Sequence, residues 1–380
     1  MSRVQTASRT LLGYPCNQAF DYTELLPFLG YHMNNVGDPY SATNFGPNTH
    51  DIEREVIETY AELTEAPADN HWGYVTNGGT EGNLYGLYLA RELYPKGIVY
   101  YSEDTHYSVA KSLRLLGARS IMIRSLESGQ IDYADLRETL RIHRDCPAIV
   151  FANVGTTMKG AIDDVGRIRR MLDDLRITEH YIHVDAALSG MILPFVDAPP
   201  AWNFRSGADS ISTSGHKMIG SPLPCGLVIA KKSHVDRIAR SVEYVGVLDT
   251  TLTGSRNAFC PLVLWYAMKR LGKEGMKAIV NNCLSTAQFA VDLLNEQGIR
   301  AHRHPHSITV IFPRPSERII KTWQLAPYRD IAHLITMPHV SRETVEQFVY
   351  EYVRPDDEET TVRASTPPGA RVLLEGADLP

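Results

Sequence analysis

The chain is organised around the stretch Ser212-Thr213-Ser214-Gly215-His216-Lys217-Met218-Ile219-Gly220-Ser221-Pro222. A single lysine lies here between a run of small residues and a loop of apolar residues, glycine and proline, an unusual setting for a solvated ammonium group. Burial lowers the pKa of a lysine and makes its neutral amine available to an aldehyde, so Lys217 is a candidate Schiff-base lysine. Taken alone, an ordinary surface lysine on a loop is the simpler interpretation.

A second stretch upstream changes that balance. Tyr181-Ile182-His183-Val184-Asp185-Ala186-Ala187 is typical of a buried strand that ends in a carboxylate and two small residues. In open α/β sheets the carboxyl ends of the strands face the ligand crevice. Pyridoxal phosphate requires a lysine for its aldehyde and an acid or arginine opposite its pyridine nitrogen. Lys217 and Asp185 together therefore predict a pyridoxal phosphate site.

A candidate phosphate-binding turn lies nearer the amino terminus. The stretch Tyr74-Val75-Thr76-Asn77-Gly78-Gly79-Thr80-Glu81-Gly82-Asn83 precedes leucines at helical spacing. Glycines let the backbone approach an anion, and the N–H groups that open a helix carry the positive end of its dipole. We expect a phosphate at Gly78, Gly79 and Thr80; the alternative is a glycine turn in which Thr80 is a plain N-cap. The stretch lacks the GxGxxG pattern of a dinucleotide site.

Strand-like and helical runs alternate through the middle of the chain. Short apolar strands separated by amphipathic helices are what a mainly parallel sheet covered on both faces requires. The sequence therefore predicts a large α/β domain. The expected strands are 98–102, 120–124, 148–154, 181–187, 210–214 and 225–230, and the expected helices are 108–116, 133–143 and 165–175.

Polar residues follow two more of these strands. His106 comes after the strand 98–102, where an imidazole can stack on an aromatic cofactor ring, although a local packing role is common for such a histidine. Asn153 or Thr157, after the strand 148–154, is a candidate hydrogen-bond partner for a cofactor hydroxyl. The segment 160–164 is expected to cap the next helix.

The chain divides into four parts. Residues 1–50 form an irregular arm rich in turn signals and aromatic residues, which are expected to pack on the rest of the protein, with a short helical stretch near 21–29. Residues 51–250 form the large α/β domain. Residues 251–355 form a small α+β domain with a long linking helical region, expected at 262–268 and 275–294. Its last helix is expected to be capped by Ser341. Residues 356–380 combine acids with a Pro-Pro-Gly run and predict a flexible tail.

Composition favours small-molecule chemistry. The 380 residues are 43% hydrophobic and 22% charged, which is ordinary for a globular protein. A formal charge of −6 with no block of Lys or Arg argues against a general nucleic-acid or membrane-surface role. The five cysteines form no CxxC pair, so neither a disulfide framework nor a metal site is indicated. With no signal peptide evident, we expect a cytoplasmic protein with reduced thiols.

Three motifs together resemble a known family. They are Thr-Asn-Gly-Gly-Thr-Glu-Gly-Asn (76–83), His-Val-Asp-Ala-Ala-Leu-Ser-Gly-Met (183–191) and Ser-Gly-His-Lys-Met-Ile-Gly-Ser-Pro (214–222). This combination resembles the group II pyridoxal-phosphate amino-acid decarboxylases, with the greatest similarity to bacterial histidine decarboxylases and plant serine decarboxylases. The resemblance covers residues 14–353 and implies fold type I, with a large parallel-sheet domain and a small carboxyl-terminal domain.

The resemblance also implies roles for single residues. Lys217 would hold the cofactor aldehyde, and Asp185 would pair with the pyridinium nitrogen. The two ring faces would lie against Ala187 and His106, with Thr157 near the hydroxyl group. The residues that match the phosphate-binding positions of the family are Gly78, Gly79, Thr80, Ser214 and His216. The family forms homodimers that build each site from two chains, and Ser255 would reach the phosphate across that boundary.

Substrate identity is the open question. The resemblance implies decarboxylation of histidine to histamine first, serine to ethanolamine second, and another amino acid third. Tyr14 and Asn44 of the arm, with Ala258 and Phe259, are expected to line the substrate pocket. Both groups of relatives usually have Gly-His where this chain has Ala258-Phe259, which suggests a more apolar or differently shaped substrate, or simple core packing. A catalytically silent pyridoxal-binding regulator and a nicotinamide enzyme are the other classes considered.

Overall fold

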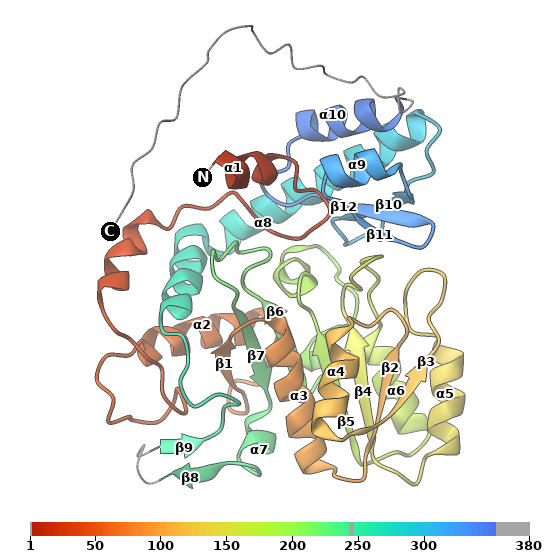
Figure 1. The fold of residues 1–380 in the computed structure, drawn as a ribbon. Helices are drawn as coiled ribbons and strands as arrows, with labels where there is room; N and C mark the ends of the chain where they lie inside the picture. Colours follow the sequence, from red (N-terminus) through yellow and green to blue (C-terminus); the bar gives the residue numbers. More distant parts are fainter. Residues whose placement is uncertain (1, 243–246, 355–380) are drawn as a thin grey trace, which may run out of the picture.

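Two sheets of unequal size define the architecture of the chain (Figure 1). The computed structural model describes residues 2–242 and 247–354. A seven-stranded sheet with the order β1-β7-β6-β5-β4-β2-β3 forms the large domain, and a three-stranded sheet with the order β10-β12-β11 forms the small one. The tail expected at 356–380 lies outside the described residues.

The large sheet is mainly parallel, as predicted. Strands β2 to β6 pair in parallel, whereas β7 is antiparallel to both of its neighbours, β6 and β1. Six strands therefore end at the same edge of the sheet. The strand bounds are β1 Trp72–Thr76, β2 Ile98–Ser102, β3 Arg119–Ile123, β4 Ala148–Asn153, β5 His180–Asp185, β6 Ser210–Ser214 and β7 Gly226–Ala230.

Helices cover both faces of the large sheet. One hydrophobic cluster joins α3, α4 and α7 to the sheet, and a larger one joins α2, α5, α6 and α8 to the other face. This two-sided burial explains the nearly continuous apolar strands of the sequence. The bounds are α2 His50–Leu63, α3 Gly79–Leu93, α4 Ser108–Leu116, α5 Tyr133–Ile142, α6 Val165–Asp174, α7 Lys232–Val235 and α8 Phe259–Glu296, and short 3-10 turns occur at Ser189–Met191, Leu193–Phe195 and Phe204–Ser206.

The small domain follows the kinked helix α8. Gly272 interrupts this helix with a φ of 59°, so the predicted runs 262–268 and 275–294 are two segments joined at a glycine. The last helix is capped by the side chain of Ser341, as predicted, since its hydroxyl accepts a hydrogen bond from the Thr344 N–H. The bounds are β10 Thr309–Pro313, α9 Glu317–Thr322, β11 Ala326–Tyr328, β12 Ile331–Ile335 and α10 Arg342–Tyr352.

The amino-terminal arm packs on both domains. Leu12 bonds through its backbone to Trp323 and Ile335 of the small domain, and Leu12 and Tyr22 are buried in the main core. The arm contains α1 (Ser2–Arg9) and a 3-10 helix, η1 (Thr23–Gly30). A helical segment was expected near residues 21–29; Pro27 lies inside it, and proline removes a backbone donor.

The sequence did not predict several features of the fold, among them helix α1 and strands β1 and β11. A short hairpin, β8 (Arg240–Val242) with β9 (Val247–Asp249), follows α7, and β7 runs against the direction of its neighbours. Runs of three residues are too short to carry a periodicity, and periodicity carries no strand direction. Asp164 caps α6 with its side chain, which confirms the predicted cap. Within residues 2–242 and 247–354, no helix has the length and apolar character needed to cross a bilayer.

Glycines on one face of α3 bring this helix close to the sheet. A Cβ atom added at Gly82 would lie 2.2 Å from Oγ of Ser212, and one added at Gly86 would lie 2.1 Å from Nδ1 of His183. Real Cβ atoms do not approach other atoms this closely, so α3 reaches β5 and β6 only because these positions lack side chains.

Replacing Gly86 with alanine tests this close approach. The added methyl group must displace the buried imidazole of His183, so Gly86→Ala is expected to lower the free energy of unfolding by about 1–3 kcal/mol. Urea denaturation measures the change. Gly275→Ala is the control, because that helical position has only ordinary contacts and should gain about 0.5–1 kcal/mol. Equal stability changes in the two variants would contradict the interpretation.

Candidate active site

The candidate site lies at the edge where the strands of the large sheet end. Gly78 follows β1, His106 follows β2, Asp185 ends β5, and Lys217 lies in the turn after β6. Because these strands run in the same direction, four segments distant in sequence meet at one edge. The sheet thus brings His106 together with residues of the three motifs.

The lysine turn is held by the amino-terminal arm. Nδ2 of Asn17 donates to the backbone oxygen of Met218 at 2.9 Å, and the hydroxyl of Tyr22 donates to that of Ile219 at 3.0 Å. Burial lowers the pKa of Lys217, while Asp185 and Cys16 oppose that shift. The loop therefore favours the neutral amine more than water does, as the sequence predicted.

Asp185 is nearly buried and bonded through both carboxylate oxygens. Nδ2 of Asn83 donates to its Oδ2 at 2.8 Å, and the Ala187 N–H donates to Oδ1 at 3.1 Å. The backbone oxygen of Ala187 in turn accepts a bond from the N–H of Ser214. These bonds fix the carboxylate beside the strand that carries Lys217.

His106 completes a cluster with the lysine and the acid. Its Nδ1 is 2.8 Å from Oγ of Ser108, which orients the ring at the start of α4. Burial lowers the pKa of His106, Asp185 opposes that shift, and Lys217 reinforces it. The segments that carry His106, Asp185 and Lys217 all lie at the same edge of the sheet. A neutral imidazole there offers a flat face without a positive charge.

A cradle of glycine and hydroxyl groups opens helix α3. The N-cap is Gly78 with a φ of 130°, and a Cβ at that position would lie 3.7 Å from Cε1 of His216. A Cβ at Gly79 would lie 2.7 Å from Oγ of Ser214. The first N–H groups of a helix lack partners within it, so this position suits an anion. Thr80 is exposed and is not the N-cap, so that alternative interpretation is wrong.

Most of the other predicted site residues are exposed to solvent in the single chain. Thr157 is exposed in the loop after β4, and Tyr14 and Asn44 are exposed in the arm. Ser255 is exposed and accepts a hydrogen bond from Nδ2 of Asn34. Phe259 is partly buried against the main core.

Asn153 has a structural role in the described chain. Its amide donates to Ser102 and Thr105 at 3.0 Å each, and its backbone N–H donates to the buried carboxylate of Asp163. Burial raises the pKa of that carboxyl to about 6. Asn153 and Thr157 were both candidates for bonding a cofactor hydroxyl. Asn153 is buried and bonded within the protein, whereas Thr157 is exposed.

Several residues of the site were missed from the sequence. Asn17 and Tyr22 come from the arm, whose contacts with the lysine turn span about 200 positions, and local patterns do not report such distances. Asn83 and His183 were inside quoted motifs but were given no role. Asn83 follows Gly79 by one helical turn, so helical spacing alone places it on the face of α3 that meets the sheet.

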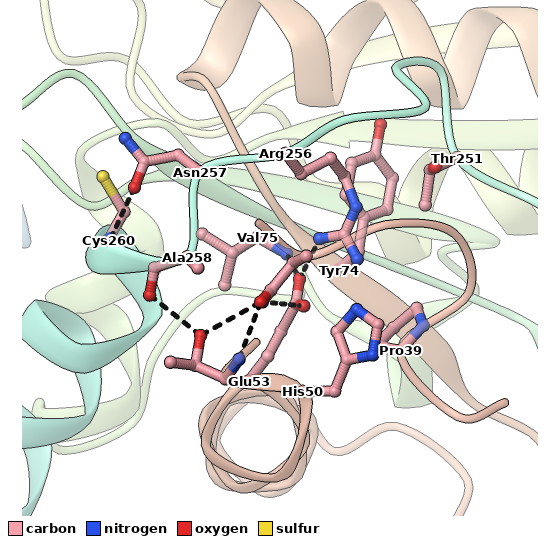
Figure 2. A network of polar contacts seen from close by, with 12 residues as sticks. Pro39, His50, Glu53, Tyr74, Val75, Thr251, Arg256, Asn257, Ala258 and Cys260 are labelled. Carbon is pink, nitrogen blue, oxygen red and sulfur yellow. Dashed lines mark hydrogen bonds and ion pairs between the residues drawn. The ribbon is translucent and has the colours of Figure 1, made fainter. Parts of the chain in front are cut away.

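A buried ion pair connects helix α2 to the segment that precedes α8 (Figure 2). The guanidinium of Arg256 pairs with Oε1 of Glu53, and the two side chains are 1% and 0% exposed. Arg256 also donates to the backbone oxygen of Gly37 at 2.9 Å. The same Glu53 accepts bonds from the Val75 N–H and from Nδ2 of Asn35, each at 2.8 Å.

This pair links four segments around the site. Val75 lies on β1, which leads directly to Gly78. Arg256 follows Ser255 directly in the chain and comes two residues before Ala258. The backbone oxygen of Ala258 accepts a 2.8 Å bond from the Thr49 hydroxyl. The Glu53–Arg256 pair therefore sets where the 250–258 segment lies relative to the cradle.

Comparisons with known proteins agree with this geometry. Residues 23–301 match the family model described as the pyridoxal-dependent decarboxylase conserved domain. The chain is 46% identical to a histidine decarboxylase of Mesorhizobium japonicum over 92% of this chain and 94% of the relative. It is 49% identical to a histidine decarboxylase of Morganella morganii over 86% of this chain and 87% of the relative.

Solved structures show the same fold. The L-methionine decarboxylase of Streptomyces sp.590 superposes with a TM-score of 0.85 at 25% identity, covering 92% of each chain. The glutamate decarboxylase of Lactobacillus brevis superposes with a TM-score of 0.77 at 20% identity, covering 92% of this chain and 89% of that one. These neighbours confirm the expected architecture of a large mainly parallel sheet with a small carboxyl-terminal domain.

Breaking the buried Glu53–Arg256 pair is expected to be costly. Glu53→Gln leaves Arg256 charged and buried without its counter-ion, so the free energy of unfolding should fall by about 3–5 kcal/mol. Urea denaturation of the purified protein measures this change. Glu62→Gln is the control, since Glu62 pairs with Lys273 where both side chains are 69% exposed, and it should change stability by less than about 1 kcal/mol. Similar changes in both variants would refute a structural role for the pair.

Proposed function

Because the chain belongs to the pyridoxal-dependent decarboxylase family, we propose that it converts L-histidine to histamine with release of CO₂. The family makes the chain a carboxy-lyase that uses pyridoxal phosphate and acts on an amino acid, and it confirms the predicted resemblance. The histidine assignment rests on the names of relatives that match nearly the whole chain at 46–49% identity.

The residues at the sheet edge fit pyridoxal phosphate. Gly79 packs so closely on Ser214 that a side chain would fill the anion cradle at the start of α3. Gly78, Gly79, Thr80, Ser214 and His216 are proposed to hold the phosphate, through backbone N–H groups and side-chain donors. Lys217, whose pKa is lowered by burial, is proposed to hold the aldehyde group.

The ring would lie between His106 and Ala187, with Thr157 near its hydroxyl group. Bound pyridoxal phosphate supplies an electron sink for the pair left at Cα when CO₂ departs. Asp185 accepts bonds from Asn83 and Ala187, which fix the position of its carboxylate. A carboxylate at this position would pair with the protonated ring nitrogen of the bound cofactor. These residues also orient the substrate, since the Cα–carboxylate bond must lie perpendicular to the ring.

Three stretches, 37–39, 44–46 and 323–326, resemble serine decarboxylases, and structural contacts account for the first and the third. Asp38 of the Gly37-Asp38-Pro39 turn accepts bonds from the Trp72 indole and the Thr250 hydroxyl, at 3.0 and 2.7 Å. Trp323 of the 323–326 segment is buried in the small domain. Both stretches support packing, so they carry little information about the substrate. Serine remains the second candidate substrate.

The residues Ala258-Phe259 differ from the Gly-His usual in the relatives, so another, more apolar amino acid is the third candidate substrate. These residues replace Gly-His, and Phe259 packs partly against the main core. A methionine decarboxylase is among the similar solved structures, and its substrate is apolar. Tyr14, Asn44, Ala258 and Phe259 are proposed to contact the substrate side chain in an assembly of two chains.

A homodimer is proposed because the arm exposes a large apolar surface. Residues with at least 40% exposure gather there, and such patches mark interaction sites. They are Tyr14, Phe20, Leu26, Phe28, Leu29, Tyr31 and Tyr40. In the dimer, Ser255 would reach the phosphate of the partner subunit. A cytoplasmic location is also proposed, supported by five free cysteines.

A panel of L-amino acids tests the reaction and its substrate. The purified protein with pyridoxal phosphate should release CO₂ from histidine faster than from serine, methionine or other members of the panel. Lys217→Ala should lower that rate by at least about 10³-fold and abolish the visible absorbance of bound cofactor. Transamination without CO₂ release would overturn the reaction. Cofactor absorbance without any turnover would instead favour a regulatory protein.

Subunit mixing tests the role of Ser255. Lys217→Ala and Ser255→Asp should each be inactive alone, the latter because a carboxylate would repel the phosphate. If Ser255 serves the partner's site, each mixed dimer formed by co-expression of both variants has one intact site of two. Random pairing makes about half of the dimers mixed, so the preparation should recover about a quarter of wild-type activity. Measured CO₂ release checks this value. Absence of restoration in dimers shown to be mixed would place Ser255 outside the partner's site.

A further inference from the structure

A continuous hydrogen-bond chain runs behind Asp185. Nδ2 of Asn83 lies 2.8 Å from Oδ2 of Asp185, and Oδ1 of Asn83 lies 3.0 Å from Nε2 of His183. Nδ1 of His183 lies 2.7 Å from Oγ of Ser210. We call Ser210, His183 and Asn83 the Asp185 support chain. Its members come from β6, β5 and α3, and all three are buried.

The direction of donation along this chain follows from the charge of Asp185. An ionised carboxylate only accepts hydrogen bonds, so the NH₂ group of Asn83 must face it. The amide oxygen then faces His183, whose Nε2 must carry the proton. Nδ1 of His183 is therefore an acceptor, and the Ser210 hydroxyl donates to it. Every hydrogen bond in the chain points toward Asp185.

Burial keeps His183 in this single-proton state. The side chain is fully buried between α3 and the sheet, and burial lowers the pKa of His183 to about 3. The ring cannot move toward α3 without meeting the backbone at Gly86, where an added Cβ would lie 2.1 Å from Nδ1. The imidazole is thus held neutral, with one tautomer set by its two partners.

Each bond of the chain constrains the next. A carboxylate oxygen accepts hydrogen bonds, and the chain presents the NH₂ group of Asn83 to Oδ2 of Asp185. The three buried groups therefore act as one unit that fixes the position of the carboxylate.

We propose that Asn83 and His183 are positioning residues that hold the Asp185 carboxylate oriented toward the ring nitrogen of pyridoxal phosphate. They act through Asp185 and contact neither substrate nor cofactor. The inference rests on the proposed role of Asp185 and adds two residues to it. Ser210 is the outermost donor and should have the smallest effect.

Two ligands separate this role from simple packing. One is pyridoxal phosphate, and the other is its carbocyclic analogue with CH in place of the ring nitrogen. The phosphate, hydroxyl and aldehyde are the same in both, so only the first can respond to the charge of Asp185. Their dissociation constants are measured by equilibrium dialysis against the full-length protein, with no need for catalytic activity.

Asn83→Leu removes the donor to Asp185 while filling a similar volume. It should weaken binding of pyridoxal phosphate by about 10- to 100-fold and leave binding of the analogue within about 2-fold. His183→Leu should act in the same direction. His183→Gln should recover most of the loss, since its NH₂ group can donate to Asn83. Thr336→Val, which removes a buried hydroxyl bonded to Cys283 in the small domain, should affect neither ligand.

Equal losses for both ligands in Asn83→Leu, or no recovery in His183→Gln relative to His183→Leu, would overturn the positioning role. Asp185→Asn decides whether the underlying assignment stands. If it weakens pyridoxal phosphate selectively while the Asn83 and His183 variants do not, only the support chain fails. If it weakens both ligands equally, Asp185 does not pair with the ring nitrogen, and the proposed site itself is wrong.

Discussion

The close approach of helix α3 to strands β5 and β6 is the constraint on which the site depends. Gly79, Gly82 and Gly86 lie along the face of α3 that meets the sheet, and each would clash with a sheet residue if it carried a side chain. The approach places the first turn of α3 beside Ser214 and His216, and it places Asn83 within hydrogen-bond distance of Asp185. Glycine destabilises the interior of a helix, so these glycines lower the stability of α3 but allow it to pack closely on the sheet.

The lysine turn depends on contacts from outside the sheet. The arm holds the backbone of Met218 and Ile219, and the same arm is bonded to the small domain through Leu12. The Glu53–Arg256 pair makes a comparable connection on another side, between β1 and the 250–258 segment. A buried ion pair contributes little net stability, but its geometry is demanding, which suits a segment whose position matters.

The sequence predicted the elements and much of the cluster, because both follow from local patterns. The strand 98–102 and the strand 210–214 have the predicted bounds, and parallel strands necessarily bring His106, Asp185 and Lys217 to one edge. Contacts of the arm could not be predicted, because nothing in a local pattern specifies which distant backbone atoms Asn17 or Tyr22 will meet. The direction of β7 was equally hidden, since alternation of apolar residues is the same in either direction.

Some residues in the stretches that resemble other decarboxylases hold the fold together and do not face a substrate. Asp38 and Trp323 lie in segments that resemble serine decarboxylases, yet their side chains serve packing and internal hydrogen bonds. His183 belongs to one of the three motifs that resemble the family, but its ring bonds to Asn83 and Ser210 rather than facing solvent. Resemblance in such residues reflects a similar fold and not a particular substrate. Tyr14 and Asn44, in contrast, have exposed side chains that take no part in the core.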